Sequence, residues 1–208
     1  GAVGSYYKSK KKREVVKEKD ISLSLAKKIH EELQKKNFSS YLTRSVDRTV
    51  SLAERAEMAE KIEADLFISV HINSSEKSGP RGFETYYLDN HDDSAVKKVE
   101  AVENKDLTGE ELIINKILTD LVIQRTVTSS KGLATSIHSE IDKSIARKFK
   151  MKDRGVRPGL FYVLALTKRP AILLEVGFLS NPRELKKMLR ADLQTTYAKA
   201  VANGIEEY

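Results

Sequence analysis

Two short, almost uninterrupted apolar runs constrain the fold of this chain more than any other feature. They are Asp65–His71, with the sequence DLFISVH, and Ala171–Leu174. Runs of this length and composition are typical of strands that are buried on both faces of an α/β sheet. We therefore expect a central sheet covered by helices on both sides. Further strands are predicted at residues 41–43, 83–88 and 161–164.

Helical periodicity fills the intervals between these strands. Apolar residues recur at every fourth position from Ile21 to Leu33, and Asp20 precedes them as a good N-cap. Comparable patterns predict helices over residues 52–63, 131–149, from 182 onward, and 193–208. Strands that alternate with helices indicate one α/β layered domain over residues 1–208, with a mostly parallel central sheet flanked by helices.

The segment 90–130 is the least regular part of the chain. It is polar, with helical stretches predicted at residues 94–103 and 112–122. We therefore interpret it as a variable, partly helical segment within the domain.

Basic residues concentrate between Lys8 and Lys19. Seven Lys and Arg against two Glu give this stretch +5 of the chain's net charge of +7. A solvated loop is the expected structure, and contact with nucleic acid or another anionic polymer is the alternative. The aromatic residues are scattered, unlike those of an RNA-recognition sheet, so no nucleic-acid partner is predicted. No stretch has the pattern of a transmembrane segment or an export signal, and the chain opens on a loop-like Gly1–Ser5.

The chain has no cysteine, which excludes disulfides, thiolate metal sites and cysteine nucleophiles. A transition-metal site would have to combine carboxylates with one of the four histidines, His30, His71, His91 and His138. His30 and His138 fall in helical patterns and are expected on helix surfaces. This donor set favours an open catalytic site over a closed structural one.

Two titratable residues end predicted strands, where α/β proteins gather their sites. His71 ends the first apolar run and Glu175 directly follows the second. A histidine there could simply bond a loop, and a carboxylate in apolar sequence could pair with Arg154 or Arg157. Taken together, an imidazole ligand and a carboxylate base are the parts of a hydrolytic zinc site without cysteine.

Several motifs in order along the chain give it a close family resemblance. They are Glu18-Lys19-Asp20, Leu42-Thr43-Arg44 with Asp47, Ser51 to Arg55, Ala64 to Asn73, Gly82 to Tyr87, Asp153 to Val156 and Ala171 to Asn181. Their order and spacing resemble the zinc-dependent N-acetylmuramoyl-L-alanine amidases of bacteria, the Amidase_3 type of cell-wall hydrolase. The resemblance extends over essentially the whole chain.

The resemblance implies that Glu18 and His71 are zinc ligands and that Glu175 is the catalytic carboxylate. The family's further ligand is a histidine in a Gly-His-Gly-Gly motif at the end of the first strand, which this chain does not contain. Gly1-Ala2-Val3-Gly4 looks like the tail of that motif. We favour the interpretation that the first strand and its histidine precede Gly1, because a sheet without that strand would expose a long edge. If they are truly missing, two ligands would hold zinc poorly.

The implied reaction is hydrolysis of the amide between N-acetylmuramic acid and the L-alanine of the peptidoglycan stem, in cell-wall remodelling or daughter-cell separation. Zinc would polarise the carbonyl and activate water, and Glu175 would serve as general base and then general acid. Peptidoglycan is the implied partner and the location is periplasmic or secreted. The basic run would then border a site that faces an anionic wall polymer. The alternative is an inactive peptidoglycan-binding or scaffold module derived from an amidase.

Some relatives carry, in the region of residues 90–130, a helix whose glutamate occupies the zinc site until an activator protein displaces it. The candidates for such a glutamate here are Glu100, Glu103, Glu110 and Glu111. Arg44 and Asn73 lie beside matched motifs, and each is either a substrate contact or an ordinary structural residue.

Overall fold

The computed structural model describes residues 2–9, 12–104 and 110–208. The strands are β1 (Val3–Ser9), β2 (Lys12–Lys17), β3 (Phe67–Asn73), β4 (Phe83–Leu88), β5 (Asp153–Gly159) and β6 (Ala171–Phe178). The helices are α1 (Glu18–Lys35), α2 (Leu52–Lys61), α3 (Ser94–Glu103), α4 (Glu110–Ile141), a π-helical turn (Asp142–Ala146), α5 (Arg147–Phe149), α6 (Tyr162–Leu166), α7 (Pro182–Met188) and α8 (Ala191–Glu206).

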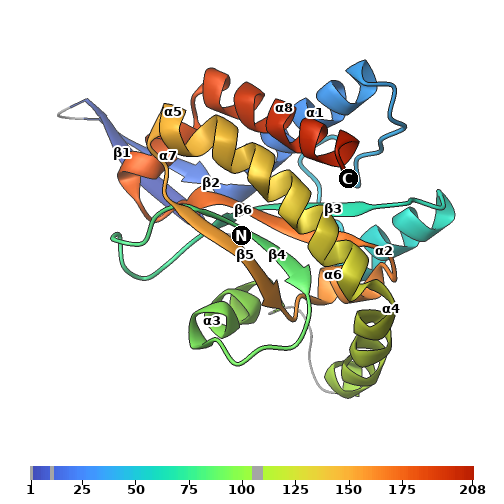
Figure 1. Cartoon of the computed structure of the whole chain (residues 1–208). Helices are drawn as coiled ribbons and strands as arrows, with labels where there is room; N and C mark the ends of the chain where they lie inside the picture. Colours follow the sequence, from blue (N-terminus) through green and yellow to red (C-terminus); the bar gives the residue numbers. More distant parts are fainter. Residues whose placement is uncertain (1, 10–11, 105–109) are drawn as a thin grey trace.

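The central sheet has the strand order β3-β6-β4-β5 (Figure 1). The pairs β3 with β6 and β4 with β5 are parallel, and β4 runs antiparallel to β6. The predicted α/β class and mostly parallel sheet are thus confirmed, with an antiparallel pair in the middle. Every residue of β6 is buried, as the apolar run in its sequence predicts.

Helices cover both faces of the sheet and create two apolar clusters. The larger cluster lies under α1, α8 and the second half of α4, and includes Ile172 and Leu174 of β6. The smaller one lies under α2, α6 and part of α4, and includes Leu173. Successive residues of β6 therefore point to opposite faces, and both faces are dry. Among the described helices, none is both long enough and apolar enough to cross a membrane.

Two predicted strands are wrong, and one strand of the central sheet was missed. Residues 41–43 form no strand, and Tyr41 is exposed. Phe161 caps the short helix α6 instead of opening a strand, because a four-residue apolar run satisfies either structure. The missed strand is β5, whose sequence DRGVRPG lacks a strand pattern. It lies at the end of the sheet, where a proline is tolerated.

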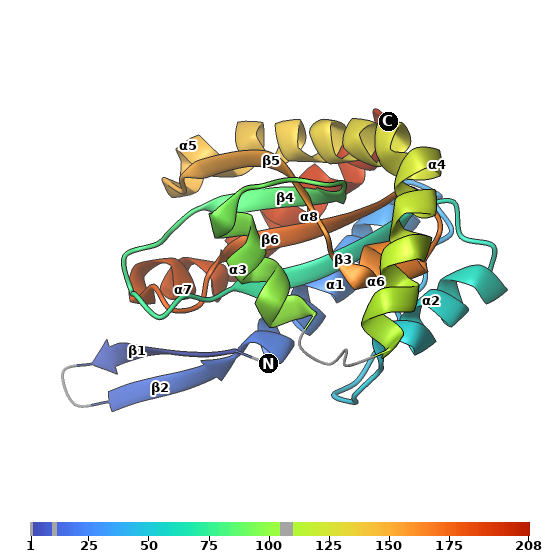
Figure 2. The same ribbon diagram turned by 90° about the horizontal axis from the view of Figure 1, so that it is seen from below.

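The described part of the basic stretch is not a loop. Its residues 8–9 and 12–17 belong to an antiparallel hairpin in which Val3 pairs with Lys17, and Glu18 and Lys19 begin α1. Figure 2 shows the hairpin projecting beside the sheet, and β1 packs against α7. Backbone hydrogen bonds between β1 and β2 stabilise these strands, so their charged side chains do not prevent strand formation. Because β2 leads directly into α1, the hairpin fixes where Glu18 stands.

The helices predicted at residues 112–122 and 131–149 belong to a single long element, α4, which continues through the π-helical turn into α5. His138 lies on its buried side, so the expectation of a surface histidine is wrong. Its Nδ1 lies 2.9 Å from Oγ1 of Thr85 and its Nε2 lies 2.8 Å from Oδ1 of Asp153. His138 thus ties α4 to β4 and β5, and these polar partners offset the cost of its burial.

The contact between α4 and α8 depends on the absence of a side chain at Gly204. A Cβ there would lie 2.4 Å from Cα of Ile137. We expect Gly204→Ala to lower the free energy of unfolding by about 1–3 kcal/mol, the usual cost of overpacking. Gly132→Ala is the control, because its Cβ would meet the ring edge of Tyr208, with Cε2 at 3.3 Å and Cδ2 at 3.9 Å, and alanine favours helix. Urea unfolding measures both variants, and equal losses would contradict the prediction.

Candidate metal centre

Ionisable side chains form a row across the sheet. His71 on β3 pairs with Glu175 on β6, and Glu175 pairs with Glu84 on β4. Residues paired across neighbouring strands project to the same face. Arg154 of β5 continues the row, since its Nε donates to Oε2 of Glu84 at 3.0 Å. The topology therefore gathers residues that lie far apart in the sequence.

Glu18 reaches His71 from the first turn of α1. Its Oε1 lies 3.1 Å from Nδ1 of His71 and also accepts from the backbone N–H of Ile72 at 3.4 Å. Its Oε2 accepts from the backbone N–H of Ala2 at 3.2 Å. The carboxylate is therefore held by the end of the hairpin and by β3, and its place at a helix N-terminus favours the charged form.

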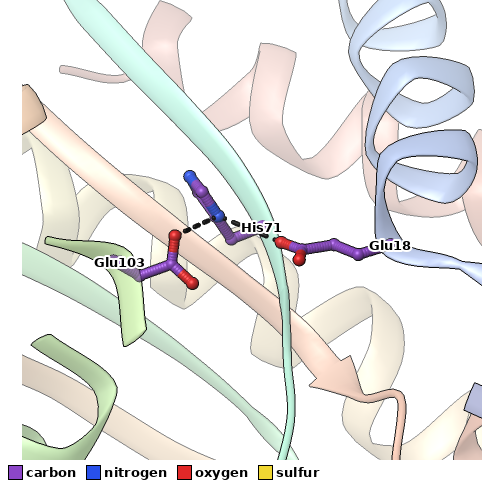
Figure 3. Close-up of side chains that lie close together, drawn as sticks. All are labelled: Glu18, His71 and Glu103. Atoms are coloured by element: carbon purple, nitrogen blue, oxygen red, sulfur yellow. Dashed lines mark hydrogen bonds and ion pairs between the residues drawn. The ribbon is translucent and has the colours of Figure 1, made fainter. Parts of the chain in front are cut away.

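Glu103, at the C-terminal end of α3, approaches His71 from the opposite side (Figure 3). Its Oε2 lies 2.8 Å from the same Nδ1 atom. Of the other candidate glutamates in this segment, Glu100 instead accepts from the backbone N–H of Leu160, 2.5 Å away. The side chains of Glu110 and Glu111 lie outside the described residues.

Glu175 is buried, with 1% of its surface exposed, and its two carboxylate oxygens find no hydrogen-bond partner within the described part of the chain. Burial raises the pKa of Glu175 well above its ordinary value, and repulsion from Glu103 adds to the effect. The alternative that it pairs with Arg154 or Arg157 is wrong, because both arginines face Glu84. An unpartnered buried carboxylate is costly, so its position calls for a functional reason.

The carboxylates also control the charge of His71. Burial lowers the pKa of His71, but Glu103, Glu18 and Glu175 outweigh burial and hold the pKa well above its ordinary value. Burial would likewise raise the pKa of Glu18, yet its hydrogen bond with His71 leaves that pKa lowered. This cluster of carboxylates thus stabilises a positive charge on His71.

This donor set fits a divalent cation. One ligand atom each from Glu18, His71 and Glu103 lies within 4.8 Å of the other two. Imidazole nitrogen and carboxylate oxygen are ligands that catalytic zinc accepts. The unpartnered Glu175 beside them is the kind of group that a hydrolytic site uses to move protons.

The other histidines do not join this cluster. Nδ1 of His30 lies 2.6 Å from Oγ of Ser40, and His91 contacts Glu100. Together with His138, they hold structural positions among the described residues. His71 is therefore the one described histidine that faces the carboxylate cluster.

Comparison with known proteins shows the family of this chain. The Amidase_3 family, described as N-acetylmuramoyl-L-alanine amidase, matches residues 1–207. The chain belongs to this family. Family membership assigns it the activity of an N-acetylmuramoyl-L-alanine amidase, a hydrolase that acts on the peptidoglycan of the cell wall.

Matches to individual relatives cover nearly the whole of this chain. The N-acetylmuramoyl-L-alanine amidase LytC of Bacillus subtilis is 29% identical over 191 residues, which are 92% of this chain and 31% of LytC. The catalytic domain of CwlV from Bacillus (Paenibacillus) polymyxa superposes with a TM-score of 0.65 and 32% identity, covering 92% of this chain and 84% of that one. The CwlD amidase of Clostridioides difficile, solved in complex with the GerS lipoprotein, has a TM-score of 0.70 at 24% identity, covering 99% and 91%.

Two remaining candidates have clear positions in the amidase fold. Arg44 donates from Nη2 to the backbone carbonyl of Lys19 at 2.8 Å, so it ties a loop to α1. Asn73 is buried and donates to Oε1 of Glu84 at 3.0 Å. Glu84 was missed by sequence reasoning. The sequence does mark Glu84, because it is the one carboxylate in the aromatic-rich strand FETYYL and burying it is as costly as burying Glu175.

Proposed function

We propose that Glu175 is the general base and acid of a zinc-dependent hydrolysis of the amide between N-acetylmuramic acid and the first L-alanine of the stem peptide. The observation that carries this proposal is the buried, unpartnered carboxylate of Glu175 beside the donors of Glu18 and His71. Those two residues would hold the zinc ion. When bound, zinc supplies a Lewis acid that polarises the scissile carbonyl and activates water.

The roles of the chain's own residues follow from their surroundings. Glu175 accepts the proton of the attacking water and delivers it to the nitrogen of the departing alanine amine. Its burial shields this transfer from bulk water. The backbone N–H groups of Ala2 and Ile72 fix the carboxylate of Glu18 beside His71.

Digestion of purified peptidoglycan by the full-length protein tests this function. We expect new amino-terminal alanine, detected by labelling and hydrolysis, and no new reducing sugar ends. Chelation of divalent metal should abolish the release, and added zinc should restore it. Release of alanine that is insensitive to the chelator would contradict the metal role.

Metal content tests the ligand assignment separately from turnover. We expect Glu18→Gln to lower the zinc affinity of the full-length protein by about 10- to 100-fold or more, since it removes a charged oxygen donor. Glu32→Gln on the same helix is the control, because Glu32 bonds Lys35 and no other side chain in the described part of the protein. Elemental analysis after dialysis against a zinc buffer measures both. A wild-type protein without zinc would favour the inactive scaffold module instead.

We further propose that α3 holds the site closed and that residues 90–130 form a regulatory segment. Glu103 contacts His71 at 2.8 Å and so stands among the atoms that a substrate would approach. A partner protein that withdraws α3 would open the site. The CwlD amidase was solved in complex with another protein, the GerS lipoprotein, which supports the proposal of a protein partner.

The proposed place of action is outside the cytoplasmic membrane, periplasmic or secreted, because peptidoglycan lies there. The proposed role is cell-wall remodelling or daughter-cell separation. Fractionation of the producing cells tests the location. Protein found only in the cytoplasm would contradict it.

A further inference from the structure

Two arginines of β5 extend the catalytic row away from Glu175. Arg154 donates from Nε to Oε2 of Glu84, which is 1% exposed, and its guanidinium lies 5.2 Å from the ring centroid of Phe178. Among the described residues, no acceptor contacts the two Nη groups of Arg154, and its side chain is 23% exposed. The buried carboxylate of Glu84 thus orients the guanidinium of Arg154, whose Nη groups remain available as donors to a ligand.

Arg157, the second arginine, already binds a carboxylate. Its Nη1 donates to Oδ2 of Asp93 at 3.0 Å, while its Nε lies 3.8 Å from Oε2 of Glu84. Asp93 is the N-cap of α3 and accepts from the backbone N–H of Ala95 through its other oxygen, Oδ1. Arg157 therefore binds a carboxylate that comes from another element of the fold, the start of α3.

The helix α3 carries one carboxylate to each end of the row. Figure 1 shows α3 beneath the sheet beside β4 and β5. Asp93, at its start, bonds Arg157, and Glu103, its last residue, contacts His71. With α3 in this position, its two carboxylates thus occupy both ends of the row, the end at His71 and the end at the arginines.

We propose that Arg154 and Arg157 form a subsite for the carboxylate of the stem residue that follows the cleaved alanine, and that Asp93 occupies this subsite while α3 is in place. The proposal rests on the proposed function, since it assumes that the scissile amide lies at Glu175. Neighbouring strands lie about 4.8 Å apart, so Arg154, which reaches back to Glu84, stands one to two strand spacings from Glu175. That separation is about 5–10 Å, and one to two extended residues, which span about 3.5–7 Å, reach its nearer part.

Paired substrates test the subsite in the full-length protein with excess zinc. The probes are N-acetylmuramoyl-L-alanyl-D-glutamate and its D-isoglutamine counterpart. In the second probe a carboxamide replaces the α-carboxylate of D-glutamate. We expect the glutamate substrate to have a kcat/KM about tenfold higher than the isoglutamine substrate, mainly through a lower KM. About tenfold is the effect on affinity that one charge-assisted hydrogen bond typically has. Arg157→Gln should abolish this preference, whereas Arg183→Gln, an exposed arginine of α7, should retain it. Equal kcat/KM values in the wild type would overturn the subsite.

Binding of the product dipeptide, L-alanyl-D-glutamate, provides a readout that does not need turnover. Asp93→Asn keeps an N-cap oxygen but removes the charge that occupies Arg157. We therefore expect it to raise the affinity for the dipeptide by about tenfold in calorimetry. Asp92→Asn, a fully exposed neighbour, should leave the affinity unchanged.

The two measurements separate the two proposals. No hydrolysis of either muramoyl substrate would count against the proposed function, and the calorimetry would still decide the subsite. Equal binding of the dipeptide by wild type and Asp93→Asn would reject Asp93 as the occupant of the subsite.

Discussion

Replacement of Glu175 by glutamine is expected to lower the rate of peptidoglycan hydrolysis by about 100- to 10,000-fold, the usual contribution of a positioned acid or base. Glutamine has nearly the same shape but cannot accept and return a proton. Release of amino-terminal alanine from purified peptidoglycan, measured with zinc in excess, gives the rate.

The fold should survive this change. Glu175 makes no hydrogen bond with any described residue, so its loss breaks no described contact and removes a buried carboxylate. The melting temperature of Glu175→Gln should therefore be at least that of the wild type. Glu57→Gln, an exposed change on α2, is the control for both measurements. Activity near the wild-type level in a folded Glu175→Gln protein would contradict the assignment of Glu175 as the general base and acid.

Replacement of Glu103 by alanine is expected to raise the initial rate of hydrolysis about tenfold. The contact between Glu103 and His71 is a charge-assisted one, typically worth about 1.5–3 kcal/mol, and the closed position of α3 loses this stabilisation in the variant. Alanine also preserves the helix, because its helix propensity is high. The assay uses saturating zinc, since Glu103 is itself one of the clustered donors.

Lys98→Gln is the matched control for this experiment. Lys98 is exposed on the same helix, and no described residue makes an ion pair with it. Its rate should equal that of the wild type. If Glu103→Ala is no faster than Lys98→Gln, then α3 does not restrain the enzyme, and Glu103 would be a ligand that supports metal binding.

The elements that sequence reasoning predicted correctly carry their signal in local periodicity. The stripe from Ile21 to Leu33 is the buried side of α1, and the two apolar runs became β3 and β6. Burial imposes these periods on a sequence, so they can be recognised without knowledge of the neighbours. The helix at residues 94–103 also coincides with α3.

The elements that were missed have no such signal. β5 depends on pairing with β4 beside it, and the hairpin depends on backbone bonds between β1 and β2. Backbone hydrogen bonds are available to almost any residue, so a charged or glycine-containing sequence can form a strand when a partner lies alongside. The buried position of His138 has the same origin, because only the packed sheet shows which side of α4 faces inward.

For the site, the sequence by itself singled out His71 and Glu175 as the parts of a hydrolytic centre, and the resemblance added Glu18. The structure places both residues within their strands, not at the strand ends, and the parallel pairing of β3 with β6 sets them side by side. Only the tertiary structure decided that Glu103 faces His71, that Glu84 rather than Glu175 binds the arginines, and that Asp93 binds Arg157. Those contacts depend on where α3 lies and on how β4 pairs with β5, and a local sequence pattern does not encode the distance between elements that are remote along the chain.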